Sequence, residues 1–370
     1  MHTLEKNVVT RPYGRFFLPG PTEVHPVVLG AQARPMMGHR GAEAQAFMKD
    51  IHRRLGDVFM TTRPVFVSTS SATGLMEAAV RNAGRGRILS LVNGAFSQRF
   101  ADIGKACGFD VETLDVVWGE AHDPDVVRSR VAEGSYDAVT LVHSETSTGV
   151  LNDVAALSAA IRETPDTLVL VDSVTGFGAA EVRPDDWGVD FLLTGSQKAF
   201  ALPPGLSFGV ASERMMVRAA EAPRRGYYFD LEFFAKNHAK DQATTTPAIS
   251  VLYSLDVQLD RMLAEGMEAR WARHRRMAER SWAWVEEMNG RGLDLQVMAP
   301  EGYRSPAVTA VVTPEGLTGP DVTSRVAERG WVVGGGYGKL KQTSFRIGHM
   351  GDHTEDELDG LLDVLTEVLT

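Results

Sequence analysis

Lys198 and Asp172 are the residues whose types and positions most clearly allow chemistry. Lys198 follows the apolar run 190–196 and precedes a loop stiffened by two prolines and a glycine, whereas Asp172 lies near the end of the apolar run 167–173. A partly desolvated lysine amine can be neutral and form a Schiff base. A buried carboxylate needs a partner, and a protonated ring nitrogen is one candidate. Each residue also has a plainer interpretation, because most lysines are exposed and an aspartate here could cap the next turn.

Hydroxyl-rich turns could complete such a site. Ser70, Ser71 and Thr73 lie between a predicted strand and a predicted helix, where free backbone N–H groups favour an anion. Many helices begin with serine or threonine, so this signal alone is weak. The same holds for Phe96, which could stack on a planar ring or belong to the core, and for the polar loop HSETSTG (143–149).

The elements that must position these residues alternate between apolar runs and amphipathic stretches. The predicted strands are 63–69, 87–94, 110–116, 138–144, 167–173, 190–196 and 206–212, and the predicted helices between them are 73–84, 96–108 and 153–165. Continuous apolar strands separated by helices indicate a parallel-rich sheet covered on both faces. The predicted fold is therefore α/β, with a mostly parallel, seven-stranded sheet between helices.

After about residue 250 the pattern changes. It predicts one long helix over 248–289, then strands at 307–313, 331–336 and 344–350 and helices at 320–330 and 355–369. We predict a large domain over 18–250 and a smaller C-terminal α+β domain over 251–370. Residues 1–17 are expected to pack on the small domain or on a partner subunit.

Composition narrows the class of protein. The 370 residues are 44% hydrophobic and 23% charged, as in ordinary globular proteins. The net charge of −10 argues against nucleic acid or an anionic membrane as the main partner. Cys107 is the only cysteine, and the histidines lack metal-site spacing, so no disulfide and no metal are predicted. No apolar run approaches the ~20 residues of a membrane span, and the N-terminus lacks a secretory signal, which predicts a cytoplasmic protein.

The order of the motifs resembles the class V, fold-type I pyridoxal-phosphate aminotransferases, and within them the alanine–glyoxylate and serine–glyoxylate (serine–pyruvate) branch. Six stretches carry the resemblance: FLPGPTEVHPVVLGA (17–31), NGAFSQR (93–99), HSETSTGV (143–150), VDSVTGFG (171–178), TGSQKAFALPPG (194–205) and FRIGHMG (345–351). The resemblance implies pyridoxal 5′-phosphate as the cofactor.

It also implies a role for each matching residue. Lys198 would bind the cofactor as a Schiff base, Asp172 would hold the ring nitrogen, and Arg346 would bind the substrate carboxylate. The other implied cofactor contacts are Ser71, Ala72 and Thr73 at the phosphate, Phe96 and Val174 on the two ring faces, Thr146 near the ring, and Gln197 and Thr246 at the phosphate. Because Thr246 would act across a subunit boundary, the resemblance implies a homodimer with shared sites.

Two departures from the family pattern concern the phosphate. Ser70 and Ala72 stand where the family usually has glycines, and Ala243 stands where some relatives have a tyrosine. Backbone approach to the phosphate must then differ slightly, and one phosphate hydrogen bond could be missing.

The expected reaction moves an amino group from alanine or serine to glyoxylate or pyruvate. The alternative donor is aspartate or 2-aminoethylphosphonate, with Arg40 or His39 binding the second anion. A non-catalytic relative that serves as a subunit of another complex is a third interpretation. The glycine run GGGYGK (334–339) is not a nucleotide-binding loop, because Val333 and Leu340 occupy positions where that motif needs glycine and serine or threonine. Cys107 lies at the end of an early helix, which disfavours a cysteine desulfurase.

Overall fold

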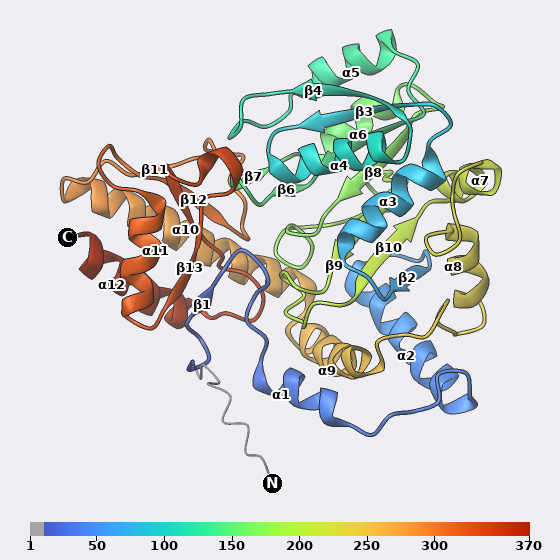
Figure 1. Ribbon diagram of the computed structural model, residues 1–370, viewed down its shortest axis with the longest axis horizontal. Coiled ribbons are helices and arrows are strands. Elements are labelled where there is room, and N and C mark those ends of the chain that lie inside the picture. Colours follow the sequence, from blue (N-terminus) through green and yellow to red (C-terminus); the bar gives the residue numbers. More distant parts are fainter. Residues whose placement is uncertain (1–10) are drawn as a thin grey trace.

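Two β-sheets organise the protein, whose structure is a computed structural model that describes residues 11–370 (Figure 1). Within these residues the larger sheet has seven strands in the order β2-β10-β9-β8-β5-β3-β4. They are β2 (Val65–Ser68), β3 (Arg87–Val92), β4 (Asp110–Asp115), β5 (Ala138–Val142), β8 (Leu168–Asp172), β9 (Phe191–Gly195) and β10 (Ser207–Ala211). β10 runs opposite to the other six strands, which are all parallel to one another. The predicted mostly parallel sheet is confirmed.

Helices cover both faces of this sheet. One core includes α3 (Ala72–Ala83), α4 (Ala95–Ala106), α7 (Glu213–Glu221) and α8 (Leu231–His238); the other includes α2 (Ala42–Phe59), α5 (Pro124–Glu133), α6 (Val154–Arg162) and α9 (Ile249–Glu265). In β8, Val169 and Val171 point into one core, and Leu168 and Leu170 into the other. Because both faces are buried, the strands are apolar along their whole length.

A smaller sheet lies beside the first (Figure 1). Its order is β1-β13-β14-β12-β11, with β1 parallel to β13 and the other pairs antiparallel. The strands are β1 (Phe16–Phe17), β11 (Gln296–Val297), β12 (Thr309–Val312), β13 (Val332–Gly335) and β14 (Ser344–Ile347), and the helices are α10 (Met267–Gly290), α11 (Gly319–Glu328) and α12 (Glu355–Leu369). The N-terminal segment thus reaches this sheet through β1; residues 1–10 of that segment lie outside the described residues.

The prediction of one helix over 248–289 is wrong, because two helices occupy that stretch. α9 ends at Glu265 and α10 begins at Met267, with Gly266 between them at φ 81° and ψ 142°. This backbone conformation is open almost only to glycine. The break lets α9 pack in a core of the larger sheet while α10 packs against the smaller one.

The remaining elements are short. They are α1 (Pro26–Gly30), the 3₁₀ turns η1 (Ala31–Ala33) and η2 (Gly338–Leu340), and a two-stranded hairpin of β6 (Ser144–Glu145) and β7 (Val150–Leu151). Within residues 11–370, no helix is both long and apolar enough to cross a bilayer.

Candidate active site

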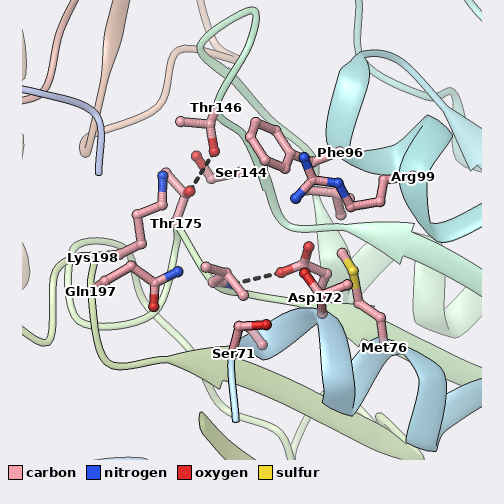
Figure 2. Close-up of a pocket in the computed structure, with 14 residues that line it drawn as sticks. Ser71, Met76, Phe96, Arg99, Ser144, Thr146, Asp172, Thr175, Gln197 and Lys198 are labelled. Atoms are coloured by element: carbon pink, nitrogen blue, oxygen red, sulfur yellow. Dashed lines mark hydrogen bonds between the residues drawn. The ribbon is translucent and has the colours of Figure 1, made fainter. Parts of the chain in front are cut away.

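A cavity lies where the central parallel strands of the larger sheet end. Figure 2 shows Lys198 and Asp172 on opposite sides of it. Nine of the predicted site residues line the cavity: Ser71, Ala72, Thr73, Phe96, Thr146, Asp172, Val174, Gln197 and Lys198. They follow β2, β3, β5, β8 and β9, and parallel strands gather their carboxyl ends at one edge of a sheet. Met76, Arg99, Val142, Ser144 and Thr175 line the cavity as well.

Lys198 enters the cavity from the turn after β9. Its side chain is buried, and its Nζ donates a hydrogen bond to the carbonyl of Pro19. Burial lowers the pKa of this amine to about 7, and the positive charge of Arg346 acts in the same direction. Gly20 leaves room for the amine, since a Cβ there would lie 2.5 Å from Nζ. The lysine is therefore held in one place and is readily neutral.

Asp172 is the last residue of β8 and is also buried. Its Oδ1 accepts a hydrogen bond from the backbone N–H of Val174 at 2.7 Å. Burial raises the pKa of the carboxyl group to about 7, and this hydrogen bond opposes the rise. Among residues 11–370, no hydrogen bond to Oδ2 is present, which leaves that oxygen for another donor.

The start of α3 offers a site for an anion. Ser71 is the N-cap residue, but its hydroxyl makes no capping hydrogen bond to the helix. In the first turn the backbone N–H of Gly74 bonds to the Ser71 carbonyl, whereas those of Ala72 and Thr73 have no backbone partner among the described residues. Free N–H groups at a helix start attract negative charge. Gln197 lines the same cavity.

Arg346 does not line the cavity but lies at its edge, on β14 of the smaller sheet. Its Nε donates to the carbonyl of Gly335 at 2.8 Å and its Nη1 to that of Thr146 at 3.1 Å. Burial lowers its pKa to about 10, so the guanidinium stays charged at neutral pH. Among the described residues no carboxylate lies within 4.0 Å of it. Its remaining N–H groups can bind a carboxylate of the substrate.

Glu145 was not predicted as a site residue, although it lies in the polar loop HSETSTG. It is fully buried, and its two oxygens accept hydrogen bonds from the backbone N–H groups of Phe96, Ser97 and Ser147 at 2.9–3.1 Å. The hydroxyls of Ser97 and Ser147 add further bonds at 3.1 and 2.6 Å. Glu145 thereby fixes the start of α4, which carries Phe96. The sequence did carry one sign of this role: Glu145 is the only acidic residue in a hydroxyl-rich loop that directly follows an apolar strand.

Three candidates lie away from the cavity of their own chain. Thr246 is exposed and does not line it. Arg40 is also exposed, and its guanidinium donates to the carbonyls of Ala243 (3.2 Å) and Thr244 (3.5 Å). His39 lines a different, mostly apolar pocket beside α2 and α9.

Proteins from two other organisms are similar in sequence to this one over nearly its whole length. The chain is 37% identical to an "Uncharacterized aminotransferase" of Methanocaldococcus jannaschii, over 92% of this chain and 89% of that protein. It is 33% identical to a "Soluble hydrogenase 42 kDa subunit" of Anabaena cylindrica, over 95% and 92%.

Two solved structures are also similar to this protein over nearly its whole length. An aspartate aminotransferase of subgroup IV from Thermus thermophilus matches 96% of this chain and 99% of its own, with 35% identity and a TM-score of 0.87. An alanine–glyoxylate aminotransferase from Nostoc sp. matches 100% and 98%, with 30% identity and a TM-score of 0.92. The predicted fold-type I architecture is confirmed.

The family model "Aminotransferase class-V" matches residues 27–339, a span that includes every cavity-lining residue. The match covers most of the chain, and the Methanocaldococcus jannaschii relative and both structural neighbours carry aminotransferase names. The chain belongs to the class V aminotransferases, enzymes that use pyridoxal 5′-phosphate.

Proposed function

We propose that this aminotransferase moves the amino group of a small α-amino acid, alanine or serine, to a small 2-oxo acid, glyoxylate or pyruvate. The observation that carries the proposal is the pairing of Lys198 and Asp172 in one cavity with Arg346 at its edge. These residues supply an amine that is readily neutral, a buried carboxylate and a cation for the substrate carboxylate.

The residues around the cavity fit pyridoxal phosphate. The free N–H groups at the start of α3 suit its phosphate, and Oδ2 of Asp172 suits its ring nitrogen. Phe96 lies 5.7 Å from the Lys198 amine, measured to the ring centre, so an aromatic face borders the space beside that amine. When bound, the cofactor supplies an aldehyde carbon for attachment and an electron-withdrawing ring.

Lys198, Asp172 and Arg346 would then act as follows. Lys198 holds the cofactor covalently, and its released amine acts as the base for the proton on Cα of the donor. Asp172 keeps its charge beside the ring nitrogen and so keeps that nitrogen protonated. Arg346 binds the α-carboxylate and orients Cα toward Lys198.

The small donor is supported by the similarity to the alanine–glyoxylate aminotransferase from Nostoc sp., and within a single chain neither predicted candidate for binding a second anion lines the cavity. Neither His39 nor Arg40 lines the cavity of its own chain, and Arg40 is bonded to the carbonyls of Ala243 and Thr244. These residues were the candidates for binding a second anion on the donor.

Aspartate is a second candidate donor, and Arg99 is the observation in its favour. Arg99 lines the cavity and, among residues 11–370, has no carboxylate within 4.0 Å. Such a cation could bind the distal carboxylate of aspartate. The similarity to the Thermus thermophilus aspartate aminotransferase adds weight.

A panel of single amino acids tests the proposal. The purified enzyme carrying its cofactor would be mixed with each amino acid, and the visible absorbance of the cofactor followed over time. Alanine and serine should give the fastest change, and added glyoxylate should reverse it. If aspartate reacts at least about tenfold faster than both, the second candidate replaces the first. If no amino acid changes the spectrum, the protein is not a working aminotransferase for these donors.

A further inference from the structure

The glycine-rich stretch 334–339 forms a close-packed turn that ends β13. A Cβ on Gly334 would lie 2.5 Å from Cδ of Pro19, and one on Gly336 would lie 2.1 Å from the carbonyl oxygen of Leu340. Side chains are therefore excluded at these two positions. Tyr337 is the one aromatic side chain of the stretch, and the close packing of Gly334 and Gly336 leaves the backbone on its N-terminal side little room to shift.

Tyr337 contacts three residues around the mouth of the cavity. Its ring centre lies 5.3 Å from that of Phe96, with the two planes tilted by 34°. The guanidinium of Arg346 lies 5.7 Å from the ring centre, and Nη2 of Arg99 donates to the hydroxyl at 3.1 Å. The side chain is 37% exposed, so it forms an outer wall and not part of a core.

A second contact holds the turn against the larger sheet. The amine of Lys339 lies 4.3 Å from the ring centre of Trp118, in the loop after β4. Tyr337 and Lys339 thus make separate contacts across to the larger sheet, and only Tyr337 contacts the residues at the mouth of the cavity.

The position of Arg346 decides where the side chain of a donor must go. A donor whose α-carboxylate binds Arg346 has its Cα between this arginine and Lys198. Lys198 occupies the inner side, where its amine bonds to the Pro19 carbonyl. The side chain of the donor then faces outward, toward the region that Phe96 and Tyr337 border.

We propose that Tyr337 is a specificity-determining residue whose ring closes the subsite for the donor's side chain and excludes large aliphatic and aromatic side chains. The inference rests on the proposed function, because it assumes that Arg346 binds the α-carboxylate. The contacts of the ring with Phe96 and Arg346 hold it in place, and the hydrogen bond from Arg99 to the hydroxyl adds to them. The ring itself, and not the hydroxyl, sets the size limit.

Three variants test this proposal: Tyr337→Ala, Tyr337→Phe and, as a matched control on the same turn, Lys339→Ala. For each enzyme, kcat/KM would be measured with alanine and with leucine as donors and glyoxylate as acceptor. Tyr337→Ala should raise the leucine-to-alanine ratio at least about tenfold, since a few methylene groups in a pocket discriminate about 10- to 200-fold each. Tyr337→Phe and Lys339→Ala should keep the ratio within about twofold of the wild type.

A ratio that stays within twofold of the wild type in a folded Tyr337→Ala enzyme overturns the proposal. If that variant does not fold, as judged by its thermal melt, Tyr337→Leu takes its place with the same expected direction. A wild-type enzyme that reacts with neither alanine nor serine would instead overturn the proposed function, so the two failures are distinguishable.

Discussion

At the scale of single residues, burial moves Lys198 and Asp172 toward the same pKa from opposite sides. The pKa of the amine falls to about 7 and that of the carboxyl group rises to about 7, because neither charge is well solvated. Near neutral pH the Lys198 amine can therefore lose its proton and act as a base, while a cationic partner beside Asp172 would favour its charged form.

The lowered pKa of Lys198 predicts the pH dependence of cofactor capture by the apoprotein. Only the neutral amine attacks an aldehyde, and Lys198 is neutral above its pKa of about 7. The rate of capture, followed by absorbance in a stopped-flow instrument, should rise between about pH 6 and 8 and then level off. A rate that still climbs above about pH 9 would show an ordinary lysine amine. Lys198→Ala should lose both covalent capture and turnover.

Asp172→Asn tests the role of the buried carboxylate. The variant keeps the size of the side chain but removes the charge that would hold a proton on the ring nitrogen. We expect the cofactor still to bind, while the single-turnover rate with alanine falls at least about a hundredfold. Asp190→Asn is the control, since Asp190 is a fully buried carboxylate outside the cavity that bonds to Val169 and Ser212. Unchanged single-turnover rates in Asp172→Asn would make Asp172 a structural residue.

Cavity residues at the ends of apolar strands could be predicted from the sequence, because parallel strands of one sheet bring their carboxyl ends to the same edge. Ser71, Phe96, Asp172 and Lys198 were all found in this way. Tyr337 and Arg99 were not, because their proximity depends on how the smaller sheet docks against α4. No local pattern records that contact.

At the scale of elements, the start of α4 depends on Glu145. Its carboxylate accepts bonds from Phe96, Ser97 and Ser147, whereas a glutamine amide at this position would turn an N–H₂ group toward some of these donors. Glu145→Gln should destabilise the fold by about 1–3 kcal/mol and lower kcat/KM, because Phe96 shifts. Ser147→Ala removes one hydroxyl, which donates to Glu145 and accepts from the N–H of Ala95 at 3.0 Å, and should cost less in urea unfolding because the buried carboxylate keeps its other donors. Equal losses in the two variants would contradict this assignment.

Gly266 separates α9 from α10, and we propose that the division between the two structural units lies there and not at residue 250. Its φ of 81° disfavours any other residue, although no atom within 4 Å of an added Cβ obstructs one. Gly266→Ala should therefore lower the free energy of unfolding by about 1–3 kcal/mol through backbone strain alone. Gly290→Ala is the matched control: its Cβ would also meet open space, at the end of α10 and without positive φ. A neutral Gly266→Ala would contradict the strain argument.

The elements themselves were partly predictable. Strands of the larger sheet were evident because burial on both faces makes them continuously apolar. The helices α1, α2, α5, α7 and α8 were not predicted. The break at Gly266 was missed because a charged, helix-favouring sequence follows it directly, and a single glycine in such a stretch is often tolerated.

At the scale of the whole molecule, the residues of the candidate site come from both sheets. The larger sheet supplies Lys198, Asp172 and Phe96 through its strand ends, while the smaller sheet brings Arg346 and Tyr337 to the edge. If Arg346 binds the substrate carboxylate as proposed, movement of one sheet relative to the other would change its distance from Lys198 without moving Lys198 relative to Asp172.

In a homodimer, each cavity could gain a phosphate contact from Thr246 of the partner chain. The threonine is exposed in one chain, and Arg40 tethers its loop through the carbonyls of Ala243 and Thr244. Large apolar side chains that a partner subunit could cover are exposed elsewhere on the chain, including Val27 of α1 at 59% and Tyr227 at 76%. We propose that Thr246 reaches the phosphate in the partner's cavity, and we expect light scattering to give the mass of a dimer.

Subunit mixing tests the shared site directly. Thr246→Glu should place a negative charge against the phosphate of the partner's site, and Lys198→Ala should disable the chain's own site. Each variant alone should be inactive, but a heterodimer of the two contains one intact site, formed by Lys198 of one chain and Thr246 of the other. Co-refolding equal amounts should restore about a quarter of wild-type activity, since half the dimers are mixed and each has one working site. Thr245→Glu, altered at the neighbouring position, should keep most of its activity alone. If mixing restores nothing while light scattering shows dimers, Thr246 acts within its own chain or not at all.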